Sequence, residues 1–378
     1  MIDSSVLEMS LPLATAGEIA VMNLESSRQQ SWSRLLQSPE RPGVAEYIVE
    51  QEQMALQFLS DAAALDRLDA LVEHLARSDA DAVRVTLIRA QVLSTEHHFS
   101  PARALLQKTE SWSAHSEAAD RLLLSIDQAC GNNLDFVMEA RRRLAAKSGR
   151  LEDLVPLGSL LADLREFDEA DRVYQQAFTN YQDVSPFALA WVCFQLGALW
   201  GELVTEPQPH RAAKWYEQAI AYVPDYVKAR VHLSEIYLED ERFDDAEALL
   251  LPALSSGDPE VDWRLADVMI AQGKALEGNA YLESAARGFE ALLAKHLLAF
   301  ADHGAEFYAG SGDNPDRALE LASVNLANRS TLRAFEQTYD VAIDAGQSEA
   351  ASDILAAARL RWGATHAFSL SPLAEMQF

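Results

Sequence analysis

The chain has 378 residues, which is enough for two or three ordinary domains or for one continuous repeat array. Its hydrophobic fraction of 49% supplies a buried core and excludes global disorder. The formal net charge of −27 repels phosphate backbones, so we expect no nucleic-acid partner. The tight basic run from Arg141 to Arg143 borders an apolar helical stripe and is predicted to be a solvated helix face.

Cysteine usage and the apolar segments exclude further classes of protein. Cys130 and Cys193 are too few for a disulfide scaffold and have no metal-ligand spacing. Residues 1–5 carry no positively charged segment ahead of an apolar stretch, so they do not fit a signal peptide. No uninterrupted apolar run reaches 18 residues, and we therefore expect no membrane span. These features favour a cytoplasmic protein.

Helical periodicity continues along the chain. The first predicted helix covers residues 16–37 and ends at a loop rich in Pro and Gly, 38–43. Apolar residues at three- and four-residue steps predict further helices at 44–59, 62–76, 115–129, 134–146, 331–345 and 348–360. No strand-like alternation persists, so the sequence predicts an all-α fold. The weaker pattern in residues 362–378 predicts a segment that either caps the fold or lies loose.

A self-similar unit recurs between about residues 151 and 293. Each copy has Leu and a small residue in its first helix and a spaced set of Ala, Tyr or Leu in its second. The copies are Leu157-Gly158 with Ala170, Tyr174 and Ala177; Leu196-Gly197 with Ala212, Tyr216 and Ala219; and Leu233-Ser234 with Ala246, Leu250 and Ala253. Ala212 and Ala246 are 34 positions apart, whereas an insertion at 205–209 lengthens the preceding interval.

A 34-residue period of helix-turn-helix units resembles the tetratricopeptide repeat. That resemblance implies a right-handed superhelical α-solenoid of stacked helix pairs, because one pair cannot bury its apolar face alone. The expected segments are an N-terminal helical segment, divergent repeats, clear repeats, divergent C-terminal repeats and a tail or cap. Their predicted ranges are 1–78, 79–148, 149–293, 294–361 and 362–378.

The same resemblance implies that the first helix of each repeat lines a concave groove where a peptide or partner helix binds. The predicted groove residues are Trp191, Phe194, Glu202, Glu235, Trp263, Asp267 and Tyr308. For Trp191 and Trp263, packing between helices is the alternative. Family members that dock chaperone tails use a Lys, Asn and Arg clamp, and this chain has apolar or acidic residues at the matched positions. An aromatic and acidic groove favours an apolar segment flanked by Lys or Arg.

Motifs for catalysis or cofactor binding are not found. The sequence has no phosphate-binding glycine-lysine loop, no nucleophile elbow and no zinc-protease helix. Glu96-His97-His98 contains the adjacent histidine pair and is predicted to be an exposed turn. We therefore expect a non-catalytic scaffold or adaptor for a protein or peptide, with no cofactor and no metal. Two alternatives are an accessory subunit that presents a substrate peptide to a separate enzyme, and an all-helical enzyme or metal-dependent protein.

Overall fold

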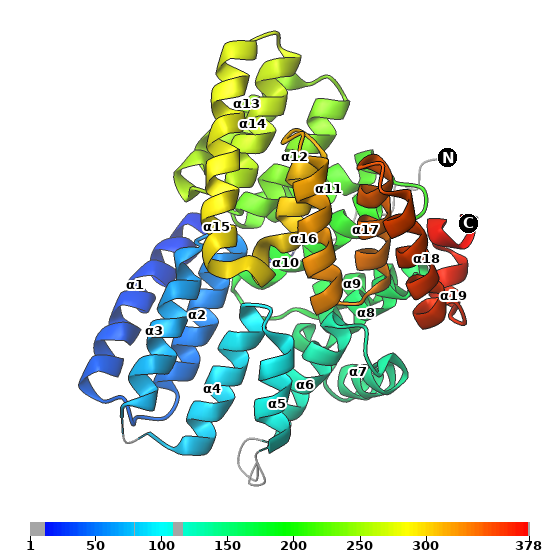
Figure 1. The fold of residues 1–378 in the computed structure, drawn as a ribbon. Helices are drawn as coiled ribbons and strands as arrows, with labels where there is room; N and C mark the ends of the chain where they lie inside the picture. The colour runs from blue at the N-terminus through cyan, green and yellow to red at the C-terminus, as the bar shows by residue number, and fades with distance from the viewer. Residues whose placement is uncertain (1–11, 79, 109–115, 377–378) are drawn as a thin grey trace.

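The computed structural model describes residues 12–78, 80–108 and 116–376, and every regular element within them is helical (Figure 1). The helices of the N-terminal part are α1 (Gly17–Gln37), α2 (Val44–Leu59), α3 (Ala63–Ala76), α4 (Ala82–Thr95), α5 (Phe99–Lys108), α6 (Ser116–Ala129) and α7 (Leu134–Ser148). The all-α prediction is confirmed. Residues 1–5, on which the signal-peptide prediction rests, lie outside the described part of the chain. So does His115, the first residue of the helix predicted at 115–129.

The remaining helices continue as stacked pairs. They are α8 (Leu151–Asp163), α9 (Phe167–Asn180), α10 (Pro186–Ala198), α11 (Pro209–Tyr222), α12 (Val227–Glu239), α13 (Phe243–Leu250), α14 (Pro259–Ala271), α15 (Ala275–Ala309), α16 (Pro315–Asn328), α17 (Leu332–Asp344), α18 (Ser348–Trp362) and α19 (His366–Ser369). A π-helical turn, η2 (Leu199–Leu203), extends α10, and the 3-10 helices are η3 (Leu251–Ser256) and η4 (Pro372–Ala374). The structure is therefore an α-solenoid.

Local sequence signals explain where several of these helices begin. Proline occupies the first turn of α10, α11, α14 and α16, where its missing N–H costs no helical hydrogen bond. The side chains of Asp258, Asn314 and Thr331 accept hydrogen bonds from backbone N–H groups at the starts of α14, α16 and α17. These signals place the helix starts independently of the packing that follows.

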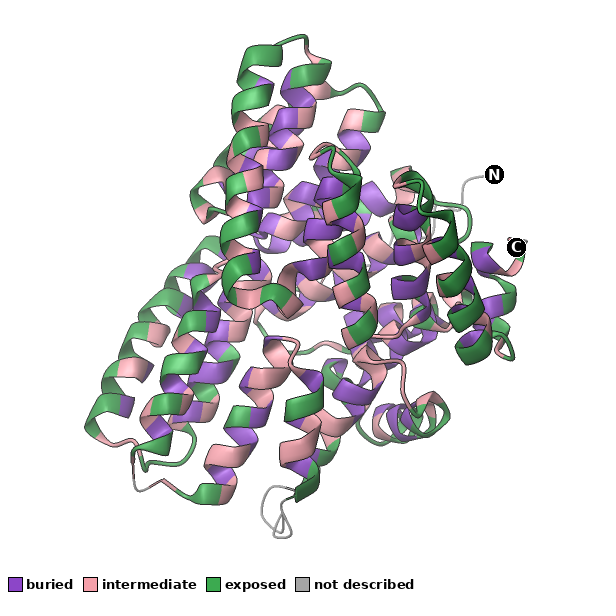
Figure 2. Cartoon of the chain, in the orientation of Figure 1, coloured by how far each residue is buried: buried purple, intermediate pink, exposed green. Residues whose placement is uncertain are grey.

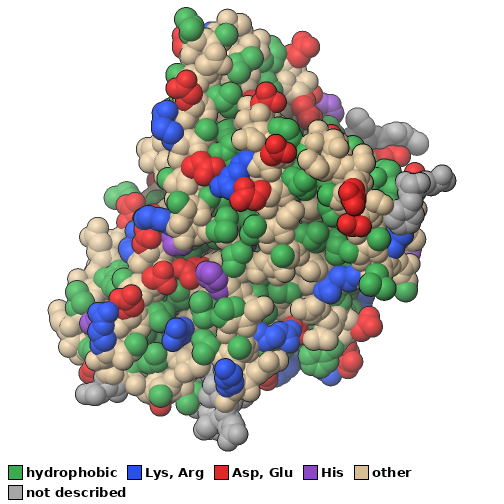
Figure 3. Space-filling view, in the orientation of Figure 1, with side chains coloured by type: hydrophobic (Ala, Val, Ile, Leu, Met, Phe, Trp, Pro, Cys, Tyr) green, Lys and Arg blue, Asp and Glu red, His purple; other side chains and the backbone are tan. Residues whose placement is uncertain are grey.

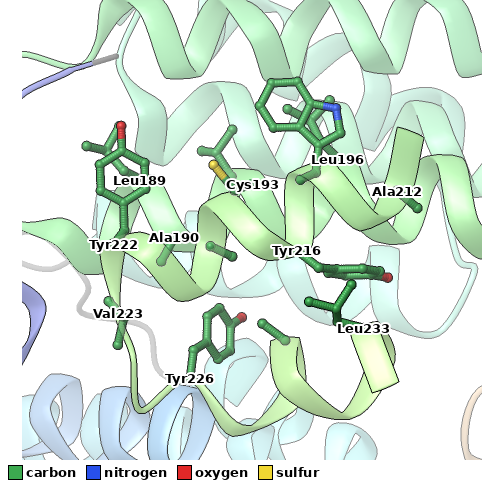
Figure 4. Close-up of a cluster of buried hydrophobic side chains, with 14 of the residues drawn as sticks. Leu189, Ala190, Cys193, Leu196, Ala212, Tyr216, Tyr222, Val223, Tyr226 and Leu233 are labelled. Atoms are coloured by element: carbon green, nitrogen blue, oxygen red, sulfur yellow. The ribbon is translucent and has the colours of Figure 1, made fainter. Parts of the chain in front are cut away.

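Small residues in the first helix of a pair allow the second helix to approach closely. A Cβ built on Gly158 would lie 2.6 Å from the ring of Tyr174, and one on Gly197 would lie 2.5 Å from the ring of Tyr216. Both tyrosines are fully buried, and Figure 4 shows Tyr216 among the apolar side chains of α10 to α12. The buried face of each helix is turned toward its neighbours, as the purple stripes in Figure 2 show.

The N-terminal helices pack on the middle of the solenoid. The Phe58 ring at the end of α2 lies 5.0 Å from that of Phe187 and 4.7 Å from that of Tyr226, measured between centroids. Ahead of α1, the backbone N–H of Thr15 donates to the carbonyl of Val184 at 2.8 Å. The first helices thus share one apolar core with α8 to α14.

The chain curls so that its C-terminal helices come to lie beside α6 to α8 (Figure 1). Arg361 of α18 donates to the carbonyls of Cys130 and Gly131, at 3.2 and 3.0 Å, and Arg165 forms an ion pair with Glu336 of α17. The solenoid is therefore closed on itself by these polar contacts and by Leu134 and Leu164, which pack against the apolar cluster of α17 to α19.

The C-terminal segment is packed. Ala367 and Phe368 of α19 and Leu373 of η4 are buried in one cluster with residues of α17 and α18, including Phe335 and Leu355. Of the two arrangements that the sequence left open, the described residues up to 376 thus adopt the packed one.

One stretch of the described chain is long and apolar enough to cross a membrane, namely Pro186–Leu203, formed by α10 and η2. Just over half of it, 56%, is buried inside the protein. Leu189, Val192, Cys193 and Leu196 have no exposed surface at all. This stretch is the central helix of the apolar core, and its composition follows from that position.

Candidate functional site

A cavity of about 1120 Å³ lies inside the closed curl of helices. Its wall comes mainly from the first helix of successive pairs, α8, α10, α12, α14 and α17, together with the second half of α15. The C-terminal residues 369–373 complete one side, and Thr205 and Pro207 of the insertion between α10 and α11 contribute to another. Elements from most of the chain length therefore build one interior space.

The wall of this cavity is rich in charge. Carboxylates outnumber the Lys, Arg and His side chains among its lining residues. The lining carboxylates are Asp163, Glu202, Glu235, Glu260, Asp302, Glu306, Glu336, Asp340 and Glu375. The lining cations and histidines are Arg165, Lys228, His232, Arg264, His303, Arg329 and Arg333.

One chain of charged contacts crosses three successive first helices. His232 Nδ1 of α12 lies 2.7 Å from Glu202 Oε1, although the two atoms are not aligned for a hydrogen bond. Glu235, one turn further along α12, forms an ion pair with Arg264 of α14. Because these residues come from consecutive pairs, the contacts link the stacked repeats along the cavity wall.

The pKa values of this pair shift in opposite directions. Burial tends to lower the pKa of His232, but the negative charge of Glu202 outweighs it and raises the value to about 9. Burial likewise opposes the charged form of Glu202, whereas His232 lowers its pKa to about 2. Each residue thus stabilises the charged form of the other, and both are charged near neutral pH.

A second set of charged contacts joins α14, α15 and the start of α17. His303 Nδ1 of α15 lies 2.5 Å from Glu260 Oε1 of α14, and the adjacent Asp302 forms an ion pair with Arg329. Burial opposes protonation of His303, yet Glu260 and Asp302 raise its pKa to about 10. Most of the acidic wall is therefore neutralised by protein cations.

Asp163, Glu306 and Arg333 are different, because they face the cavity without a close ionic partner. Asp163 and Glu306 have exposed side chains and form no ion pair among the described residues. Although both side chains are reached by solvent through the cavity, the surrounding walls remove part of their hydration, which raises the pKa of Asp163 to about 6 and also raises that of Glu306. The Arg333 side chain is 65% exposed, and its nearest carboxylate, Glu202, is 3.8 Å away.

The structure separates the predicted groove residues into two groups. Phe194, Glu202 and Glu235 line the cavity. Trp263 and Tyr308 are nearly fully buried in the core around α14 to α16, so their rings pack between helices. The two remaining predicted residues, Trp191 and Asp267, are half-buried outside the cavity lining. A contact between any of these residues and a peptide stays a prediction.

One sequence-based expectation about a charged segment is wrong, and a second holds for only part of its residues. The turn containing Glu96 and His97 is not exposed, because Glu96 is 6% exposed and His97 Nδ1 lies 3.1 Å from the carbonyl oxygen of Leu298. Within the basic run, Arg141 is buried and hydrogen-bonds Ser125, while its neighbours pair with glutamates. The turn with Glu96 and His97 is covered by α15, which the chain brings back from elsewhere, whereas the Arg142 and Arg143 side chains are 51% and 63% exposed.

Sequence reasoning missed most cations of the cavity wall. His232 and His303 line the same space although no local spacing relates them. The positions one helical turn from the predicted groove residues would have pointed to Arg264 and His232. Among the described residues, no group of three or more His, Cys, Asp and Glu side chains is arranged to hold a metal ion. On the face shown in Figure 3, Lys and Arg side chains are scattered among acidic ones rather than forming a continuous basic patch.

The model of the tetratricopeptide repeat family matches residues 203–259, which cover α11 and the pair of α12 and α13 and reach the start of α14. The chain therefore contains tetratricopeptide-type helical repeats. This confirms the family inferred from the 34-residue period, and such a fold is a scaffold for protein–protein interaction. No curated protein matches the chain.

Several solved structures are similar to this tetratricopeptide protein over much of its length. The Cut9–Hcn1 hetero-tetramer of APC/C shares 14% identity with a TM-score of 0.42, covering 94% of this chain and 68% of that one. The human IFIT1 dimer with PPP-AAAA also shares 14% identity with a TM-score of 0.42, covering 96% and 97%. The C-terminal part of a TPR repeat-containing protein from Cytophaga hutchinsonii shares 15% with a TM-score of 0.38, covering 66% and 98%. Identities this low do not carry a partner from those proteins to this chain.

Proposed function

We propose that this tetratricopeptide protein is a non-catalytic scaffold or adaptor that holds a polypeptide segment of a partner protein inside the cavity. The observation that carries this proposal is the cavity itself, which is large enough for several side chains of a bound segment. Its wall combines apolar surface from Phe194, Leu203 and Leu332 with charged groups that are already in place. A cytoplasmic location belongs to the same proposal.

The composition of the wall favours one kind of segment. Apolar patches between charged groups suit a peptide with apolar anchors, and the excess of carboxylates favours flanking Lys or Arg. The preformed ion pairs keep the charged side chains in position, so less side-chain ordering is needed on binding.

The test is selection of 12-residue peptides from a random display library against the full-length protein, followed by hydrogen exchange on the complex. We expect enriched peptides to carry Lys or Arg beside apolar residues and to protect α10, α12 and α17. Ala198 lines the cavity, so Ala198→Trp fills part of it and should weaken binding about tenfold or more.

Ala275→Trp is the matched control, because Ala275 is exposed at the start of α15 and outside the cavity lining. It should leave the dissociation constant within about twofold. Equal binding by wild type and Ala198→Trp, or protection confined to the outer helices, would contradict the proposal. So would the absence of any enriched peptide.

A further inference from the structure

Arg333 differs from the other arginines of the cavity wall. The side chains of Arg264 and Arg329 are 21% and 23% exposed, and each is held in a close ion pair. The Arg333 side chain is 65% exposed, and its guanidinium is only loosely placed, 3.8 Å from Glu202. A cation this weakly held in an enclosed space is easily displaced, because little interaction energy is lost when it moves.

The surroundings of Arg333 are acidic. Burial lowers its pKa, but the charges of four carboxylates overcome that effect and raise the value; they are Glu202, Glu306, Asp302 and Asp163. Glu202 and Asp302 already have His232 and Arg329 as partners. Asp163 and Glu306 have only amide hydrogen bonds, from Gln128 and Gln337 respectively.

Asp163 and Glu306 face the cavity with no ion pair among the described residues, so water and the nearby charge of Arg333 are what balance their charges in the free protein. We propose that Asp163, Glu202 and Glu306 form a cation subsite inside the cavity, which receives a Lys or Arg side chain of the bound segment and whose charge Arg333 partly balances in the free protein. This inference rests on the proposed function and adds the charge that the segment must carry.

The subsite acts by exchange of one cation for another. When the partner's Lys or Arg enters, the Arg333 side chain moves away along the cavity, where most of its surface is already accessible. The incoming cation gains both unpaired carboxylates, which Arg333 does not contact. Arg333 therefore keeps the acidic pocket partly neutralised until the partner is bound, at the cost of some affinity.

Removing Arg333 gives an outcome that a simple packing role would not produce. The probes are three fluorescein-labelled apolar decapeptides that differ only in a central Lys, Gln or Glu, titrated into the full-length protein by fluorescence anisotropy. Arg333→Gln should lower the dissociation constant of the Lys peptide about tenfold and should leave that of the Gln peptide within about twofold. Asp163→Asn and Glu306→Gln should each weaken the Lys peptide by about five- to tenfold.

Lys228→Gln removes the same charge from the same cavity, but the charge of Lys228 acts on Glu260 and His303, outside the proposed subsite. It should lower the dissociation constant of the Lys peptide by less than about threefold. Arg89 is exposed on the protein surface, and Arg89→Gln should leave this dissociation constant unchanged. Circular dichroism checks that each variant is folded. Equal tightening by Lys228→Gln and Arg333→Gln would overturn the subsite, because it would reveal only the overall field of the cavity.

A second outcome would also overturn the subsite, namely that wild type binds the Glu peptide best and that Arg333→Gln abolishes this binding. Arg333 would then be a residue that binds an anionic side chain. If all three peptides bind wild type equally and Arg333→Gln changes nothing, the subsite fails while the proposed function stands. If none of them binds wild type or any variant, the subsite and the proposed function both fail.

Discussion

At the level of single residues, the cavity wall couples charge to stability. Glu202 and His232 are both largely enclosed, and each would be costly to keep charged alone. As a pair, each residue stabilises the charge of the other and so offsets the loss of hydration that burial causes. The consequence is that the structure depends on the protonation state of residues that also line the proposed binding space.

The pH dependence of stability follows from these shifts. The pKa of His232 is raised to about 9, mainly by Glu202 acting against burial, so its contribution is complete below pH 6.5 and lost as pH rises through 9. The pKa of Glu202 is lowered to about 2, so its contribution is complete above pH 4.5 and lost as pH falls toward 2. We expect the urea midpoint to be highest near pH 5–6 and to fall between pH 7 and 10.

His232→Gln should lower the free energy of unfolding at pH 6 by on the order of 1–3 kcal/mol and should flatten the fall above pH 7. Part of that fall remains in the variant because His303, with a pKa of about 10, still titrates. His210→Gln is the control, since the His210 side chain is 83% exposed. Urea denaturation followed by circular dichroism at pH 5.5, 7.5 and 9 measures the effect. An unchanged alkaline slope in His232→Gln would refute this account.

At the level of helix pairs, a small residue facing a tyrosine sets the spacing within a repeat. The small residue is Gly158 in one copy and Gly197 in the next, and Ser234 occupies the matching place in the third, where it is 1% exposed. This contact brings the two helices of a pair together, and the tyrosine fills the space that the missing side chain leaves.

Gly197→Ala tests this contact. Its Cβ would lie 2.5 Å from the Tyr216 ring, which is fully buried and has no room to move, so we expect a loss of about 1–3 kcal/mol. In an unhindered helix the same change stabilises by roughly 1 kcal/mol, so the sign separates packing from helix propensity. Gly304→Ala is the comparison, because its Cβ would lie 3.1 Å from flexible leucine methyl groups and should cost less. A Gly197→Ala protein with a raised urea midpoint would exclude the proposed packing role.

Helix positions were largely predictable from the sequence because their signals are local. The predicted helix at 44–59 coincides with Val44–Leu59, and the one at 348–360 lies within Ser348–Trp362. Proline, glycine and capping side chains mark such ends within a few residues. The stretch α15 differs, since it consists of two helices that meet at a kink at His296, where φ is −130° and ψ is 53°.

At the level of the whole molecule, the cavity was not predictable in the same way. Phe194, Glu202 and Glu235 could be assigned to a concave face from the repeat register. Arg329 and Arg333 reach the same space only because small rotations between successive pairs add up until the solenoid closes. No local spacing encodes that sum. The groove expected to be aromatic and acidic is acidic in the structure, but arginine and histidine side chains line it as well.

Polar contacts join the two ends of the solenoid beside the apolar packing of Leu134 and Leu164 on α17 to α19, and this leads to a prediction about shape. Arg165 pairs with Glu336, and Arg361 donates to the carbonyls of Cys130 and Gly131. Contacts of this kind are weaker per area than an apolar core, so the two ends of the curl should separate before the repeats unfold. The double variant Arg165→Ala with Arg361→Ala should therefore open the cavity while keeping the helical content.

Small-angle X-ray scattering should show a larger radius of gyration for the double variant, and hydrogen exchange should be about tenfold faster in α17 and α18 than in wild type. The far-UV circular dichroism spectrum should be unchanged. Arg143→Ala removes an exposed pair with Glu139 on α7 and should change neither measurement. A double variant with wild-type scattering would mean that apolar contacts such as Trp362 against Gly131 hold the curl closed without the arginines, and that the cavity does not open at this seam.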